Sequence, residues 1–151
     1  MHKPIRLVHF ADVHVGMENY GRLDTDSGTS TRVRDFLDRI DEVNPKVNAV
    51  VQVARDRSLK EAVSADKTVE DGGPVGVLHG VPFTVKDNIE TKGIVCACGT
   101  EGLRNNIPQS DATVVSRIRA AGGILIGKTN IPEMGMGYET DNLVYGRTNN
   151  P

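Results

Sequence analysis

The stretch GVPFTVKDNIE, residues 80–90, decides the fold of this chain. Residues 83–85 are aromatic or β-branched and follow a Gly-Val-Pro turn signal, which predicts a short strand. Lys86 stands at the C-terminal end of that strand, directly before the turn-forming pair at residues 87–88. The sequence therefore predicts a lysine presented at the end of a strand.

Lys86 is a candidate general base because of this position. A lysine that loses hydration at the end of a buried strand has a lowered pKa. A neutral lysine amine can take a proton from a serine hydroxyl, and so activates a nucleophile without a histidine. The alternative is a surface lysine whose side chain extends from the strand end into water.

Three segments in sequence order resemble the amidase signature family. The family's lysine motif is similar to residues 78–88, LHGVPFTVKDN. The helix and strand that follow it in the family resemble residues 111–133, DATVVSRIRAAGGILIGKTNIPE. The segment that leads into its Gly-Ser-rich motif resembles residues 142–151, NLVYGRTNNP. The resemblance covers residues 44–151. It implies an α/β/α fold with a mixed sheet, and a Ser–cis-Ser–Lys hydrolase of carboxamides in which Lys86 is the lysine. Both serines belong to the Gly-Ser-rich motif, so the chain is expected to be a truncated piece that is inactive alone.

The first 43 residues indicate a different chemistry. Residues 5–10 predict a strand, and Asp12 and His14 follow it with a metal-ligand spacing, because residues two apart on an extended segment point to the same side. Residues 5–22 resemble the start of a calcineurin-like metallophosphoesterase of the DNA-repair nuclease branch, which implies that Asp12 and His14 match its first metal-ligand motif. A polar loop is the alternative. The other ligands of that family have no counterpart, so we expect no catalytic metal pair at Asp12 and His14.

The two resemblances meet at an amphipathic helix that begins at Arg32. Its apolar stripe is formed by Val33, Phe36, Leu37, Ile40 and Val43. We expect Asn44-Pro45 to end it. The predicted organisation is a metallophosphoesterase-like segment at residues 1–43 and a partial amidase domain at 44–151. A chimera of two reading frames, an amidase with an unusual N-terminus, and a non-catalytic protein that associates with itself all stay open.

The remaining periodicity predicts an α/β fold. The expected order is β-α-β-α-β-α-β, with a short β-loop-α segment before the amidase-like part. After the first helix the expected elements are a strand at 47–53, a helix at 54–66, the strand at 83–85, a helix at 111–121 capped by Asp111, a strand at 124–126 and a short helix at 131–136. Residues 67–74 and 91–108 are expected to be loops.

Composition narrows the function classes. The 151 residues suit one domain, and 18 basic against 20 acidic residues give a net charge of −2, which argues against a nucleic-acid-binding surface. No apolar run reaches transmembrane length. Cys96 and Cys98 are too few for a zinc site and are expected to be reduced in a cytoplasmic protein. We expect no cofactor for the amidase and a divalent metal only for a phosphoesterase. The expected partners are a small amide for the completed enzyme, no membrane, and copies of the chain bound through exposed sheet edges.

Overall fold

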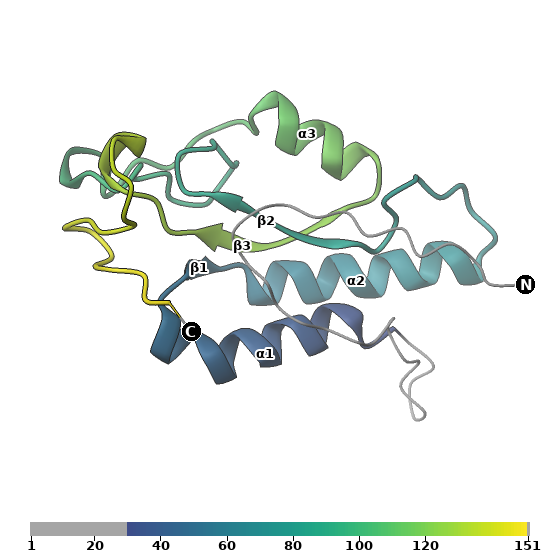
Figure 1. The fold of residues 1–151 in the computed structure, drawn as a ribbon. Coiled ribbons are helices and arrows are strands. Elements are labelled where there is room, and N and C mark those ends of the chain that lie inside the picture. The colour runs from purple at the N-terminus through teal and green to yellow at the C-terminus, as the bar shows by residue number, and fades with distance from the viewer. Residues whose placement is uncertain (1–29, 151) are drawn as a thin grey trace, which may run out of the picture.

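A computed structural model describes residues 30–150 (Figure 1). In chain order the elements are α1 (Arg32–Val47), β1 (Val50–Val53), α2 (Arg55–Glu70), β2 (Pro82–Lys86), α3 (Thr113–Ala120) and β3 (Ile124–Thr129), with 3₁₀ turns at Glu101–Leu103 and Glu133–Gly135. The strand predicted at residues 5–10 lies outside the described part of the chain.

The three strands form one mixed sheet in the order β1-β3-β2. Strands β2 and β3 are parallel and are connected through α3, whereas β1 runs antiparallel to β3. Lys86 pairs with Thr129, so the C-terminal ends of the two parallel strands lie side by side. The α/β class and the mixed sheet expected from the sequence are thereby confirmed.

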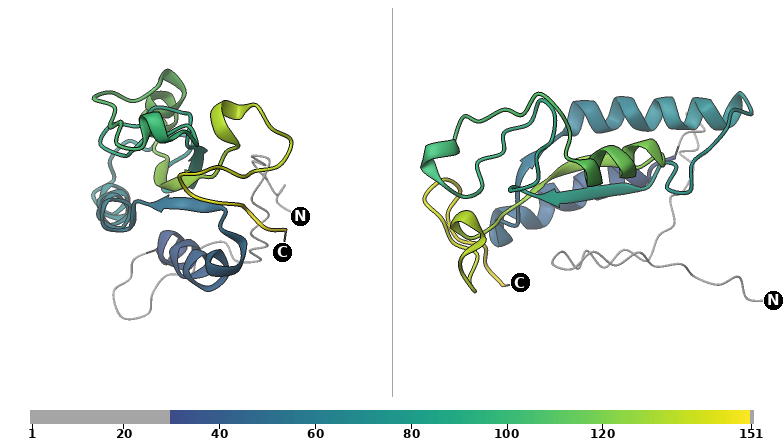
Figure 2. Two further views of the ribbon diagram at one scale, coloured as in Figure 1. Left: turned by 90° about the vertical axis from the view of Figure 1, so that its left-hand side faces the viewer. Right: turned by 90° about the horizontal axis from the view of Figure 1, so that it is seen from above.

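Helices cover both faces of the sheet (Figures 1 and 2). Helices α1 and α2 lie on one face, where α1 buries three residues of its predicted stripe: Val33, Leu37 and Ile40. Helix α3 lies on the other face and packs Val115 on Phe83, Val85 and Leu125. The result is the three-layer α/β/α arrangement, with an aliphatic core on each side of the sheet.

The prediction that Asn44-Pro45 ends the first helix is wrong. Helix α1 continues through Pro45 to Val47, and Asn48 closes it in the left-handed conformation with φ of 52°. Pro45 lies in the last turn, where its missing N–H removes only one backbone bond. The Asn44 side chain secures the exit: its Oδ1 accepts the N–H groups of Ala49 (2.9 Å) and Val50 (2.8 Å).

Two other expectations on helix ends need correction. Helix α2 continues beyond residue 66 to Glu70, where the Thr68 hydroxyl donates to the Ser64 carbonyl at 2.9 Å, and Gly72 then turns the chain with φ of 66°. Asp111 does not cap α3, because Ala112 holds the N-cap position. The Asp111 carboxylate instead accepts the Lys92 N–H at 2.7 Å and so ties the long 91–108 connection to the start of α3.

Gly127 is required where β1 approaches β3. A Cβ added there would meet the backbone oxygen of Gln52 at 2.5 Å, a separation that real structures do not tolerate without a backbone shift. We expect Gly127→Ala to lower the free energy of unfolding by about 1–3 kcal/mol, measured by urea denaturation. Gly102→Ala is the matched control, because its added Cβ meets nothing within 4 Å. Equal unfolding midpoints for the two variants would contradict this packing.

Candidate active site

A cleft of about 530 Å³ opens at the C-terminal ends of β2 and β3. Lys86 and Thr129, the last residues of the two strands, line it together with Asn130 and Ile131. The segment that follows β3 supplies Tyr138 to the cleft wall. The C-terminal ends of parallel strands are where α/β folds present their reactive groups, so this cleft is the candidate site.

Lys86 lies in the cleft because side chains alternate along β2. Phe83 and Val85 are buried towards α3, and the pleat therefore turns Lys86 to the opposite face. Lys86 is half-buried. Its backbone is held on the C-terminal side, since the Asp87 N–H donates to the Thr129 carbonyl at 2.9 Å and the Ile89 N–H donates to the Lys86 carbonyl at 3.0 Å.

Two buried asparagines, Asn130 in the cleft wall and Asn142 behind it in the C-terminal segment, hold that segment against β3. The Asn142 amide donates to the Asn130 side-chain oxygen at 2.8 Å and to the Ile131 carbonyl at 2.9 Å. The Asn130 amide donates to the Gly146 carbonyl and to the Thr148 hydroxyl, both at 3.0 Å. Sequence reasoning assigned no role to Asn130 or Asn142. For Asn130 the sequence offered one signal, a polar residue directly after a strand that begins with the apolar run at residues 124–127.

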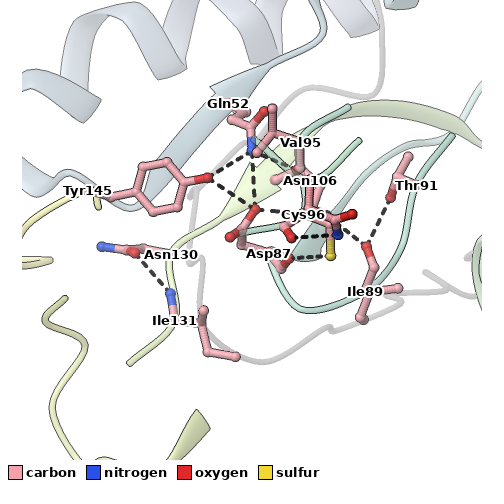
Figure 3. A network of polar contacts seen from close by, with 11 residues as sticks. Gln52, Asp87, Ile89, Thr91, Val95, Cys96, Asn106, Asn130, Ile131 and Tyr145 are labelled. Atoms are coloured by element: carbon pink, nitrogen blue, oxygen red, sulfur yellow. Dashed lines mark hydrogen bonds and ion pairs between the residues drawn. The ribbon is translucent and has the colours of Figure 1, made fainter. Parts of the chain in front are cut away.

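A separate buried network surrounds Asp87 and includes Gln52 and Tyr145 (Figure 3). A second lysine, Lys128, belongs to it. Lys128 and Asp87 are both fully buried, with 3.9 Å between Lys128 Nζ and Asp87 Oδ1. Lys128 Nζ donates to the Ile89 carbonyl at 2.7 Å. The Gln52 amide donates to Asp87 Oδ1 at 3.1 Å, and the Tyr145 hydroxyl donates to the same oxygen at 3.4 Å. Sequence reasoning did not identify this network.

Burial moves the pKa values of this network in opposite directions. Desolvation raises the pKa of Asp87, and Lys128 is the main influence that opposes the rise. Desolvation lowers the pKa of Lys128, against the attraction of Cys96 and Asp87. Burial, reinforced by the Asp87 charge, raises the pKa of Tyr145 to about 12, so its hydroxyl stays a donor at neutral pH. The fully buried lysine is thus Lys128, which does not line the cleft, whereas Lys86 is half-buried and lines it.

The other candidate residues are placed as follows. Asp12 and His14 lie outside the described residues, and within residues 30–150 no three His, Cys, Asp or Glu side chains gather to hold a metal.

Cys96 and Cys98 are both free thiols. Cys96 is buried and its Sγ donates to the Asp87 carbonyl at 2.9 Å. No helix within residues 30–150 is long and apolar enough to cross a membrane.

A family model and several relatives match most of this chain. The amidase family model matches residues 31–151. One subunit of the glutamyl-tRNA(Gln) amidotransferase of Alkaliphilus metalliredigens is 42% identical over 119 residues, which cover 79% of this chain and 24% of that protein. An acylamidase of Rhodococcus erythropolis is 44% identical over 116 residues, which cover 77% of this chain and 24% of the acylamidase.

Solved structures give the same result. The peptide amidase of Stenotrophomonas maltophilia aligns with a TM-score of 0.72 and 34% identity over 80% of this chain and 26% of its own. A bacterial aryl acylamidase of the amidase signature family aligns with a TM-score of 0.73 and 31% identity over 79% of this chain and 25% of its own. This chain therefore spans about a quarter of the length of the relatives it matches.

The match also bears on the first helix. The family-model match begins at residue 31, and α1 therefore lies inside the match. From the sequence, residues up to 43 were assigned to a phosphoesterase-like segment. The comparisons give no support to a metallophosphoesterase part or to a chimera. With the family model over residues 31–151 and a fold shared with solved amidases, this chain belongs to the amidase family.

Proposed function

We propose that this chain supplies the lysine base of a Ser–cis-Ser–Lys hydrolase that cleaves carboxamides. One observation carries the proposal: Lys86 lines the 530 Å³ cleft at the C-terminal ends of β2 and β3 in a chain of the amidase family. In the proposed reaction a serine attacks the amide carbonyl and a second serine passes the proton to Lys86. Backbone N–H groups stabilise the oxyanion, the amine leaves with the proton that Lys86 returns, and water then cleaves the acyl-serine to release the carboxylic acid and free the serine. No cofactor takes part.

The nucleophile is proposed to come from the part of the family fold that this chain does not span. Residues 30–150 contain five serines, and none of them lines the cleft. Ser58, for example, is fully buried in α2, where its hydroxyl donates to the Arg55 carbonyl at 2.9 Å. Large apolar side chains near the cleft are exposed, with Met136 at 84% and Tyr138 at 110% of their reference areas. These side chains provide a surface on which further polypeptide can pack.

The proposed partners and compartment follow from the same features. The substrate is a small carboxamide, with no nucleic acid or membrane involved. Two free thiols, Cys96 and Cys98, support a reducing cytoplasmic compartment. A second candidate, a non-catalytic protein that associates with its own copies, is favoured by one observation. In the described sheet β1 and β2 are both edge strands, and unpaired edges are templates for further pairing.

A segment exchange tests the proposed function. Residues 31–151 of this chain replace the matching segment of the Rhodococcus erythropolis acylamidase, which is 44% identical. We expect the exchanged enzyme to hydrolyse the carboxamide that its parent hydrolyses, because this segment brings its own lysine and cleft wall. The 151-residue chain alone should release no measurable amine from simple carboxamides, since none of the serines in residues 30–150 lines its cleft.

The parent acylamidase and the unmodified 151-residue chain are the controls, and the circular dichroism melt of each protein reports folding. An exchanged enzyme that folds like its parent but does not turn over would contradict the proposal. Turnover by the 151-residue chain alone would also contradict it, because the nucleophile would then lie within this chain.

A further inference from the structure

The buried pair Asp87–Lys128 has no evident reason to exist for stability alone. Both side chains are fully buried and lie 3.9 Å apart. Removing two charges from water is costly, and apolar residues of similar shape often serve a core as well or better. Such residues lie close by in the sheet, at Val85 and Leu125. The pair is therefore better explained by a role in fixing the local backbone geometry.

The geometry that it fixes is that of the residue next to Lys86. Residue 87 is held through its backbone by Thr129, whose carbonyl accepts the N–H at 2.9 Å, and by Cys96, whose Sγ donates to the carbonyl at 2.9 Å. Its carboxylate is held by Gln52 and Tyr145, at 3.1 and 3.4 Å (Figure 3). These contacts come from β1, β3, the 91–108 connection and the C-terminal segment.

Several of these contacts are also linked to one another. The Gln52 amide donates to the Tyr145 hydroxyl at 3.1 Å and to the Val95 carbonyl at 2.8 Å, and it thus joins the C-terminal segment to the 91–108 connection. Lys128 Nζ donates to the Ile89 carbonyl, which closes the turn that follows Lys86. With residue 87 and this turn fixed, the backbone on the C-terminal side of Lys86 is fixed as well.

We infer that Asp87 is the positioning residue of the site. Anchored by Lys128, Gln52 and Tyr145, it fixes through the shared peptide the direction in which the Lys86 amine enters the cleft. Asp87 and Lys128 do not line the cleft themselves and act only through Lys86. The catalytic meaning of this role rests on the proposed function, but the geometric claim concerns this chain alone.

Amine labelling of the 151-residue chain tests the geometric claim. A small aryl ester acylates lysines, and peptide mass spectrometry gives the rate at Lys86 relative to the exposed Lys60 on α2. We expect Asp87→Asn, which keeps the shape but removes the charge, to raise the relative rate at Lys86 several-fold towards that of Lys60. Tyr145→Phe removes a single contact with Asp87 and should raise it less.

Leu37→Ala is the matched control, because it weakens the core on the α1 side without touching the network. If loss of stability alone loosened Lys86, Leu37→Ala would raise the relative rate as much as Asp87→Asn does, and the inference would fail. It would also fail if neither Asp87→Asn nor Tyr145→Phe changed the rate. If Asp87→Asn does not fold, the labelling rates at Lys86 in Tyr145→Phe and Leu37→Ala are compared, and a rate in Tyr145→Phe no higher than that in Leu37→Ala would contradict the inference.

A second measurement links positioning to turnover in the exchanged acylamidase. We expect Asp87→Asn to lower kcat by about 100-fold, the effect of a misplacement near 1 Å, with KM little changed. Leu37→Ala should leave both constants near those of the exchanged enzyme, and equal kcat for Asp87→Asn and the exchanged enzyme would contradict the positioning role. If the exchanged enzyme is inactive, the proposed function fails, and the labelling of Lys86 still decides the positioning role.

Discussion

Lys86→Ala is expected to abolish amide hydrolysis in the exchanged acylamidase while leaving it folded. A positioned general base contributes roughly 10²–10⁴-fold to rate, so kcat should fall by at least about 100-fold. The fold should tolerate the change, because Lys86 is half-buried at the mouth of a cleft and not part of either apolar cluster. The free energy of unfolding should change by less than about 1 kcal/mol. Amine release and urea denaturation of the same preparation measure the two effects.

Lys86→Arg separates a base from a binding cation. Arginine keeps the positive charge but does not lose its proton in proteins, so it cannot accept one from a serine. We expect Lys86→Arg to be as inactive as Lys86→Ala, whereas Lys60→Ala on the exposed side of α2 should keep full activity. Substantial turnover by Lys86→Arg would show that the site needs a charge and not a base.

Lys128→Met is expected to destabilise the chain by about 3–5 kcal/mol, the typical cost of leaving one member of a buried ion pair alone. The variant removes the cation that lies 3.9 Å from Asp87 Oδ1 and leaves a fully buried carboxylate unpaired. The double variant Lys128→Met/Asp87→Asn removes both charges and should recover most of the loss. Urea denaturation of the 151-residue chain gives these values. A double variant no more stable than Lys128→Met would contradict this account.

The loss in Lys128→Met should shrink as the pH falls. Desolvation raises the pKa of Asp87 above its ordinary 3.8, and Lys128 is the main influence that opposes the rise. A group with a raised folded-state pKa adds stability that is complete below its unfolded pKa and is lost as pH rises through the folded pKa. Without Lys128 that folded pKa rises further, so the variant is disfavoured most at neutral pH. A difference from wild type that stays constant or grows from pH 7.5 to pH 5 would contradict this assignment.

The sequence predicts this fold well where the signal is local. The apolar stripe of α1 predicts which residues are buried, and Val33, Leu37 and Ile40 are. The strand at residues 83–85 and its terminal lysine are specified by β-branched and aromatic residues beside a turn. Prediction fails where distant segments decide. Helix α1 passes Pro45 because Asn44 secures its exit through Ala49 and Val50, which no local pattern indicates.

The candidate site shows the same division. The place of Lys86 at the C-terminal end of β2 was predictable, because an aromatic and β-branched run followed by a turn pair is a local signal. The fully buried lysine is Lys128, and its partner Asp87 is contacted by Cys96 of the 91–108 connection and by Tyr145. A lysine in ILIGKTN carries no local sign that a carboxylate 41 residues earlier, at Asp87, will share its burial. Buried polar networks of this kind depend on long-range contacts, so the sequence pattern alone did not reveal this one.

The most direct test of the central claim is the distance from Lys86 Nζ to the nearest serine hydroxyl in a crystal structure of the exchanged acylamidase. If this chain supplies the base, that distance should lie at about 2.6–3.2 Å, the reach of a proton transfer. Lys128 should remain buried beside Asp87. A structure in which Lys86 points away from every serine, while another side chain contacts the nucleophile, would contradict the account.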